Sequence, residues 1–209
     1  MLKDKGLDVI YNGIDTDIFR PQDKQKCRQE LGLPQDKKIV LIVAKGASSN
    51  PWKGGNYAQW AINALKADSR AFFVDLGGNT NRSENGLKTV GFTANNEVLA
   101  KYYSAADMLL YPSLADNCPL VILEAMACGL PIVTFHTGGI PELVEHKING
   151  YIAGYKDSEE LKKGLNYMID LPDQEIEKMR QYSVAKIRSG FTVEKMTEKY
   201  LELYQKLLK

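Results

Sequence analysis

Short apolar runs alternate with amphipathic stretches along most of this chain, and this rhythm constrains the fold more than any other feature. Runs such as 38–44 (KIVLIVA) and 107–111 (DMLLY) are typical of strands that are buried on both faces. Between them lie segments whose apolar residues recur at helical spacing, such as 56–66 (NYAQWAINALK). Strands that alternate with helices favour a parallel sheet covered by helices on both faces. The sequence therefore predicts a fold of the α/β class.

The same pattern predicts the individual elements. Strands are expected at 38–44, 71–76, 89–92, 107–111 and 130–134, and helices at 56–66, 95–106, 119–128 and 140–144. Beyond Tyr155 the pattern is helical, with Ser158 as the cap of a helix over 159–169 and a mostly polar surface helix over 174–188. A last helix over 192–209 carries one apolar stripe of Met196, Tyr200, Leu203 and Leu207.

Composition excludes several classes of protein. With 209 residues, 44% hydrophobic and 25% charged, the chain is long and apolar enough for one folded domain. The net charge of +1 gives no electrostatic reason to expect nucleic acid as a partner. No run of 18 apolar residues exists, so no transmembrane segment is expected. The start, MLKDKGLDV, has no apolar signal-peptide core, and Cys118 and Cys128 have the setting of buried free thiols. We therefore expect a cytoplasmic protein.

One acidic residue, Glu124, lies inside the apolar run Pro119–Val133, and Asp116 precedes that run. An unpaired buried carboxylate costs roughly several kcal/mol, so Glu124 needs a partner or a ligand. If a helix begins near Pro119, the N–H groups of Leu120 and Val121 face an anion, and two carboxylates beside it suit a hydroxyl-rich phosphate ester. Alternatively, Asp116 caps the helix and Glu124 pairs with a buried arginine or lysine. The sequence leaves both interpretations open.

Two glycine-containing loops follow expected strands. In the first, 45–55 (KGASSNPWKGG), Lys53 stands just before a helix and could meet a diphosphate, although the loop alone favours a solvated lysine. This loop is neither a P-loop nor a GxGxxG fingerprint. In the second, Gly138 and Gly139 allow a close backbone approach to a ligand or form a plain helix-entry turn. The acidic pair in Asp15-Thr16-Asp17 lies in a turn segment, and we expect no metal there.

Several segments together resemble the C-terminal, donor-binding half of a GT-B glycosyltransferase, specifically the retaining family 4 group. In chain order the segments that carry the resemblance are VIYNGIDTDIFRP, Trp52-Lys53-Gly54, VGFTANNEVLAKYYSAADMLLYPS, TGGIPELVEHKINGYI and FTVEKMTEKYLELYQKLL. The resemblance covers nearly the whole chain. It implies a single Rossmann-like domain that forms half of a GT-B architecture.

The resemblance also implies roles for individual residues. Glu124 takes the position of the glutamate that binds the donor ribose. Asp116 takes the position of the glutamate that faces the transferred sugar, and its side chain is one methylene shorter. Lys53 takes the position of the diphosphate-binding lysine. Lys45 is the nearest base to the position of an upstream arginine, and its role departs from the family pattern. The remaining implied donor contacts are Gly54, Asn117, Leu120, Val121, Gly138 and Gly139.

The implied reaction is transfer of a sugar from a nucleoside diphosphate sugar to an acceptor hydroxyl, with retention and with no metal or other cofactor required. The acceptor, a sugar or a lipid-linked glycan, would bind through an N-terminal half that this chain does not contain. The chain alone would then be inactive. Its expected parts are a linker and short helix (1–35), the nucleotide-sugar-binding domain (36–190) and a closing helix (191–209). Alternatives are a nucleotide-sugar-binding module without turnover and a GT-B-fold epimerase; in the full-length protein, peripheral attachment to the inner membrane face is also compatible.

Overall fold

The computed structural model describes residues 8–43, 50–78 and 81–208, and its centre is a seven-stranded sheet. The strand order is β3-β4-β2-β1-β5-β6-β7, and every neighbouring pair is parallel except β3 with β4. This confirms the predicted α/β class and the mostly parallel sheet. The strands are β1 (Lys38–Val43), β2 (Ala71–Gly78), β3 (Arg82–Glu84), β4 (Leu87–Gly91), β5 (Met108–Tyr111), β6 (Ile132–Phe135) and β7 (Gly150–Ala153).

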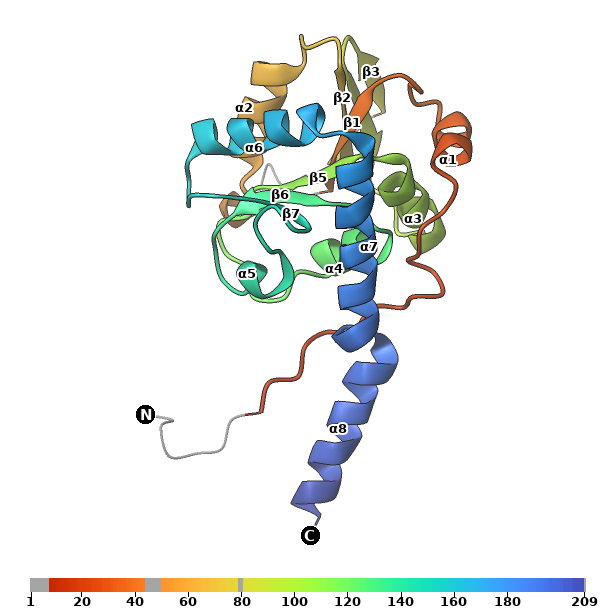
Figure 1. Cartoon of the computed structure of the whole chain (residues 1–209), viewed down its shortest axis with the longest axis vertical. Coiled ribbons are helices and arrows are strands. Elements are labelled where there is room, and N and C mark those ends of the chain that lie inside the picture. The colour runs from red at the N-terminus through yellow and green to blue at the C-terminus, as the bar shows by residue number, and fades with distance from the viewer. Residues whose placement is uncertain (1–7, 44–49, 79–80, 209) are drawn as a thin grey trace.

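Helices cover both faces of the sheet (Figure 1). Along β1, Ile39 and Leu41 belong to one buried cluster, and Val40 and Ile42 belong to the other, as alternation along a strand requires. The first cluster includes residues of α1, α3 and α4, and the second includes residues of α2 and α6. The helices are α1 (Lys24–Leu31), α2 (Gly55–Leu65), α3 (Asn96–Ala105), α4 (Leu120–Ala127), α5 (Ile140–Leu143), α6 (Ser158–Asp170), α7 (Asp173–Gly190) and α8 (Val193–Leu207), with a 3₁₀ turn, η1, at Pro51–Lys53.

The ends of the helices test the capping predictions. The sequence favours Asn95 or Asn96 as the cap of α3, and the structure places it at Asn95, whose side chain accepts hydrogen bonds from the N–H groups of Glu97 and Val98. The expected cap of α6 is wrong by one residue. Asp157 has the extended backbone of a cap and accepts from the N–H of Glu160, so Ser158 lies inside the helix.

Two strands were not predicted, and one helix is less superficial than expected. The exposed strand β3 and the half-buried strand β7 lie at the two edges of the sheet and lack a long apolar run. Helix α7 buries Ile176, Met179 and Ile187, so it is amphipathic. Most of its residues are polar, and the apolar stripe is too narrow to stand out in the sequence pattern.

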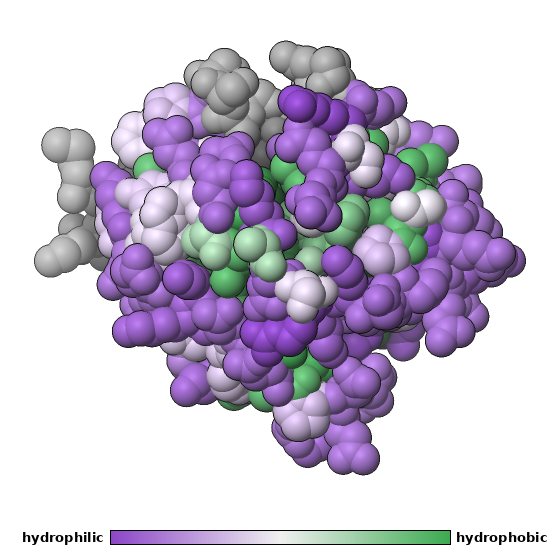
Figure 2. All heavy atoms as spheres, turned by 90° about the horizontal axis from the view of Figure 1, so that it is seen from above, coloured by the Kyte–Doolittle hydropathy of each residue, from purple (hydrophilic) through white to green (hydrophobic). Residues whose placement is uncertain are grey.

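Helix α8 extends α7 downward and projects beyond the domain (Figure 1). None of its residues is buried, and Tyr200, Tyr204 and Leu207 of its apolar face are between 42% and 74% exposed. Seen from above, the surface of the molecule is mostly hydrophilic, with apolar residues in small patches between polar ones (Figure 2). In the described part of the chain, no helix combines the length and the apolar character needed to cross a membrane.

The N-terminal segment is tied to the junction between α7 and α8. The N–H of Ile14 donates to the carbonyl of Phe191, and the N–H of Val193 donates to the carbonyl of Ile14. The ring of Tyr11 packs on that of Phe191 at 5.1 Å between centroids. The two ends of the described chain are therefore held together beneath the sheet. The expected domain boundaries, 1–35, 36–190 and 191–209, stay a prediction.

Candidate functional site

The candidate site lies at the carboxyl edge of the sheet, where the loops after β1, β5 and β6 meet. Strands β1 and β5 are central neighbours, and the chain proceeds outward from them in both directions. Such a reversal of strand order is where parallel α/β sheets open a crevice for ligands. All the described residues that the sequence nominated follow one of these three strands. Lys45 is outside the described residues.

The loop that follows β1 is fastened to the loop that follows β5. The carbonyl of Trp52 accepts hydrogen bonds from the N–H of Leu114 at 2.7 Å and from the hydroxyl of Ser113 at 3.1 Å. Gly54 has φ +66°, and a Cβ built there would be 1.8 Å from the carbonyl oxygen of Pro112. Only glycine permits both the backbone conformation and this approach. Lys53, exposed at the end of η1, is thereby held beside the β5 loop.

The loop that follows β6 packs on the same β5 loop. The N–H of Gly139 donates to the carbonyl of Asp116 at 3.1 Å. A Cβ at Gly138 would be 1.9 Å from the oxygen of Asp116, and one at Gly139 would be 2.0 Å from the oxygen of Asn117. The close backbone approach expected at these glycines is therefore an approach to the loop that carries Asp116. Their contact with a ligand stays a prediction.

Helix α4 begins directly after the loop that follows β5. Pro119 is its N-cap residue and provides no side-chain hydrogen bond. The first N–H groups to bond inside the helix are those of Ile122 and Leu123, which donate to Pro119. In the described part of the chain the N–H groups of Leu120 and Val121 meet no acceptor, and Leu120 is 48% exposed. The helix start therefore offers the two donors and the positive dipole end that an anion requires.

Glu124 lies on the second turn of α4 and is half-buried. Its Oε2 accepts a hydrogen bond from the hydroxyl of Tyr103 at 2.7 Å. Among the described residues no lysine or arginine nitrogen comes within 4.0 Å of it. Burial raises the pKa of Glu124, and the Tyr103 bond opposes this only in part. The carboxylate is thus held in place by a neutral donor and keeps a second oxygen for another ligand.

Asp116 is held in a similar way from the end of β5. Its Oδ2 accepts a hydrogen bond from the hydroxyl of Tyr111 at 2.8 Å. Burial, together with this bond, raises the pKa of Tyr111, so the phenol remains a donor at neutral pH. Asp116 does not cap α4, whose N-cap residue is Pro119. The structural alternative to a ligand role, a cap at Asp116 with an ion pair at Glu124, is therefore absent from the described residues.

The N-terminal segment reaches the same loops, which sequence reasoning missed. The side-chain amide of Asn12 donates to the carbonyl of Cys118 at 3.1 Å, directly before the start of α4. The hydroxyl of Tyr11 donates to Glu142 on α5. In the sequence, the segment VIYNGIDTDIFRP carried part of the family resemblance, but no pattern connected Tyr11 or Asn12 with the start of α4. These two contacts tie the segment before the domain to the start of α4.

Metal binding has no support in the described residues. In the chain described, no three His, Cys, Asp or Glu side chains gather closely enough to hold an ion. Asp15 instead accepts hydrogen bonds from the N–H groups of Asp17 and Ile18, which makes the acidic pair a turn. Cys128 is buried and Cys118 is half-buried, so the expected burial is complete for only one of the two thiols.

Comparison with known proteins defines the class. The family model described as glycosyl transferases group 1 matches residues 23–186, and the chain belongs to this family. A D-inositol 3-phosphate glycosyltransferase from Mycobacterium tuberculosis (strain ATCC 25618 / H37Rv) is 26% identical over 214 residues, which cover 97% of this chain and 44% of that protein. The chain therefore spans about half the length of the curated relatives it matches.

Solved structures of glycosyltransferases have the same fold as this chain. A sucrose-phosphate synthase from Thermosynechococcus elongatus has a TM-score of 0.82 at 24% identity, covering 95% of this chain and 52% of that one. Anabaena Alr3699/HepE in complex with UDP-glucose has a TM-score of 0.79 at 26% identity, covering 95% and 57%. The fold is that of the C-terminal domain of a GT-B glycosyltransferase, which confirms the Rossmann-like domain and the resemblance.

Proposed function

We propose that this chain is the donor-binding half of a glycosyltransferase that moves a sugar from a nucleoside diphosphate sugar to an acceptor hydroxyl with retention. The observation that carries the proposal is Glu124, a half-buried carboxylate with a neutral donor on one oxygen and no cation on the other among the described residues. The burial of a carboxylate without a cation costs stability that one hydrogen bond from Tyr103 offsets only in part, and a ligand would account for this cost. The structure of the Anabaena relative with UDP-glucose supports this ligand class.

The donor would bind along α4. The N–H groups of Leu120 and Val121 and the ammonium group of Lys53 would bind the diphosphate, with Lys45 of the same loop as a weaker contributor. Glu124 would accept hydrogen bonds from both ribose hydroxyls, since a carboxylate suits a vicinal diol. Asp116 would face the transferred sugar. The other contacts would come from the backbone at Gly54, Asn117, Gly138 and Gly139.

The chemistry of this site would lie in stabilising the leaving group. When the bond from the anomeric carbon to the diphosphate oxygen breaks, negative charge develops on that oxygen. A helix start and a lysine that are already oriented toward the oxygen stabilise this charge without reorganisation. Two N–H donors and one ammonium group supply what a divalent metal supplies elsewhere, so we propose that none is required.

The acceptor would bind to a second half that completes the active site. The chain matches only about half the length of its relatives, and the apolar face of α8 is exposed. We propose that α8 and the linker of residues 1–35 join residues 36–190 to that half, which would bind a sugar or lipid-linked glycan in the cytoplasm or at the inner membrane face. The isolated chain would then bind a nucleotide sugar without transfer. An epimerase is the rival enzyme class.

The test is donor binding and turnover on the same purified chain. Calorimetric titration with nucleoside diphosphates should give a saturable exotherm, and incubation with radiolabelled donor and sugar acceptors should give no transfer product. Absence of binding to every nucleotide would refute the donor site. Transfer by the 209-residue chain alone would refute the assignment of the acceptor site to another half. Conversion of a nucleotide sugar to its epimer would support the rival class.

A further inference from the structure

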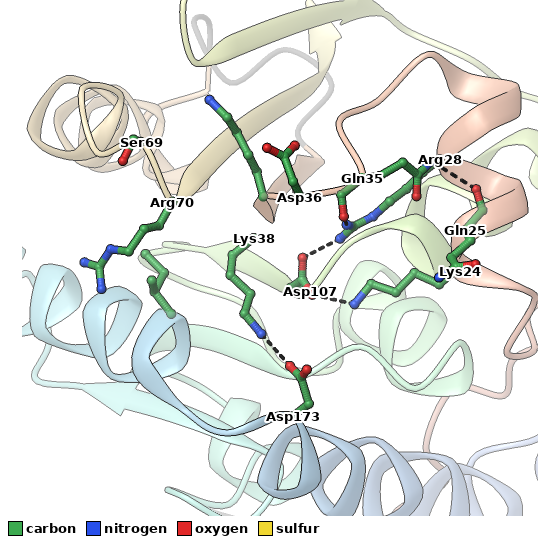
Figure 3. A pocket seen from close by; sticks show the side chains of 12 residues that line it. Lys24, Gln25, Arg28, Gln35, Asp36, Lys38, Ser69, Arg70, Asp107 and Asp173 are labelled. Atoms are coloured by element: carbon green, nitrogen blue, oxygen red, sulfur yellow. Dashed lines mark hydrogen bonds and ion pairs between the residues drawn. The ribbon is translucent and has the colours of Figure 1, made fainter.

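A cavity lies at the amino edge of the sheet, at the opposite end of the strands from the candidate donor site. We call it the amino-edge cavity; it has a volume of about 580 Å³. Lys38 begins β1, Arg70 precedes β2 and Asp107 precedes β5, and all three line it. Residues from the first turn of α1 and the first residue of α7 close its sides (Figure 3). The proposed function makes no use of this cavity.

Positive charge exceeds negative charge at the inner wall. The buried carboxylate of Asp107 accepts from Arg28 Nη2 at 2.6 Å and also from the ammonium group of Lys24 (Figure 3). Asp107 and Arg28 expose 5% and 6% of their side chains, and Lys24 exposes 33%. One carboxylate faces two cations there, so a net charge of +1 remains at low dielectric.

The acids that balance this charge lie at the exposed rim. Lys38 Nζ is 2.8 Å from Asp173, whose side chain is 95% exposed. A pair with such an exposed acid is screened by water and is worth little. Arg70, which lines the cavity, pairs with Asp68 and Asp170 at 2.7 Å, and neither of these two acids is part of the lining. Asp36 and Lys37 also line the cavity and cancel each other in charge. The rim is therefore neutral or acidic, and the single excess positive charge lies at the inner wall, where Asp107 meets Lys24 and Arg28.

Two helix starts lie at the cavity, and one of them begins with a cation. Lys24 is the first residue of α1, where a cation opposes the helix dipole, although the acidic N-cap Asp23 comes directly before it. Helix α7 starts beside Lys38 with Asp173, and Asp173 and Glu175 in its first turn offset its dipole. Burial lowers the pKa of Lys24, and the neighbouring Arg28 acts in the same direction against the pull of Asp107. An anion beside Lys24 would offset the burial of its ammonium group and its repulsion from Arg28.

We propose that the amino-edge cavity binds a phosphate-sized dianion, either free or as the phosphate group of a small monoester, between the ammonium groups of Lys24 and Lys38. The ammonium groups of Lys24 and Lys38 both line the cavity, where they pair with Asp107 and Asp173 (Figure 3), and two such groups suit a compact dianion as point charges. The volume exceeds that of the phosphate alone and leaves room for the small group of a monoester. A nucleotide fits poorly, because the lining contains no aromatic side chain on which a base could stack.

The test is an amide chemical-shift titration of the isotope-labelled chain with inorganic phosphate and, separately, with glycerol phosphate. We expect saturable shifts around Lys24, Lys38 and Asp173. The double variant Lys24→Gln, Lys38→Gln should weaken binding by about tenfold or more, the lower range for hydrogen bonds to charged groups. Arg28 still neutralises Asp107 in this variant, and Lys38→Gln alone serves if the double variant does not fold.

The matched control is Lys53→Ala at the donor crevice. Lys53→Ala should leave phosphate binding unchanged and weaken nucleoside diphosphate binding. The double variant should weaken phosphate binding and leave nucleoside diphosphate binding unchanged. Phosphate also stabilises folded proteins in general because it is excluded from their surface. This effect is the same for all variants and does not count as binding. Tighter binding of glycerol phosphate identifies a monoester, and equal binding identifies the free ion. No saturable shift, equal affinity in wild type and double variant, or shifts confined to Leu120 and Val121 would overturn the proposal.

Discussion

Replacing Glu124 by glutamine separates a ligand-binding carboxylate from a structural one. The variant keeps the shape and removes the charge. If the carboxylate accepts both ribose hydroxyls, hydrogen bonds to a charged acceptor are replaced by weaker ones to an amide. Hydrogen bonds to charged groups are worth about 1.5–3 kcal/mol, so nucleoside diphosphate affinity should fall by roughly 10–150-fold.

The stability of the variant should move in the other direction. Burial raises the pKa of Glu124 in the fold, so between the unfolded and folded pKa values the native state holds more protons, and stability falls as pH rises through this window. At neutral pH the charged form is therefore a cost to folding. The amide that replaces the carboxylate removes that cost and still accepts the hydrogen bond from Tyr103. Glu124→Gln should keep or raise the Tm at pH 7, and the gain should shrink as the pH falls to about 4, near the ordinary pKa of a glutamate.

The assay is calorimetric titration and thermal unfolding of the same preparations. The matched control is Glu202→Gln, the same chemical change on an exposed residue of α8. It should alter neither quantity. If Glu124 were half of a buried ion pair, the variant would instead lose about 3–5 kcal/mol, or roughly ten degrees in Tm at about 2–4 °C per kcal/mol. A fall of that size with unchanged nucleotide affinity would refute the ribose assignment.

The remaining predictions concern the loops and the N-terminal segment. Lys53→Ala should weaken nucleoside diphosphate binding by roughly 10–150-fold, and Lys45→Ala by less; calorimetry showing equal losses would contradict the assignment of the loop. Asn12→Ala removes the bond to the residue before Pro119 and should weaken the same binding by about 2–13-fold, with a nucleoside lacking phosphates as the unaffected control. Gly138→Ala would bring a Cβ within 1.9 Å of a loop carbonyl at φ +51° and should cost about 1–3 kcal/mol in thermal unfolding. Gly190→Ala, with no atom within 4 Å of its Cβ, should cost nothing, and equal losses would reject the packing argument.

The central strands were predictable because burial on both faces makes them continuous apolar runs. Strand β1, predicted at 38–44, lies at Lys38–Val43 in the structure. The edge strands β3 and β7 escaped prediction because one or both of their faces meet solvent, and short polar segments carry no such signal. The cap at Asp157 escaped because aspartate and serine, which both favour caps, are adjacent in the sequence.

The candidate site was predictable in part. A lone carboxylate in an apolar run is visible in one dimension, so Glu124 and Asp116 could be selected from the sequence. The tyrosines that bind these two carboxylates could not be selected in the same way. Tyr103 reaches Glu124 through the packing of α3 on α4, and Tyr111 reaches Asp116 through the turn of the loop after β5, and neither arrangement has a sequence pattern. The contact of Asn12 with the loop before α4 joins residues 106 positions apart, and no local pattern encodes it.

The account rests most directly on the claim that the start of α4 binds a nucleoside diphosphate. Amide chemical shifts, followed while UDP, GDP and ADP are added in turn to the isotope-labelled chain, test it in one measurement. At least one of the three should produce saturable shifts centred on Leu120, Val121 and the Gly138–Gly139 loop. Titrations in which none of the three saturates, or in which the shifts gather away from the carboxyl edge of the sheet, would contradict the donor site.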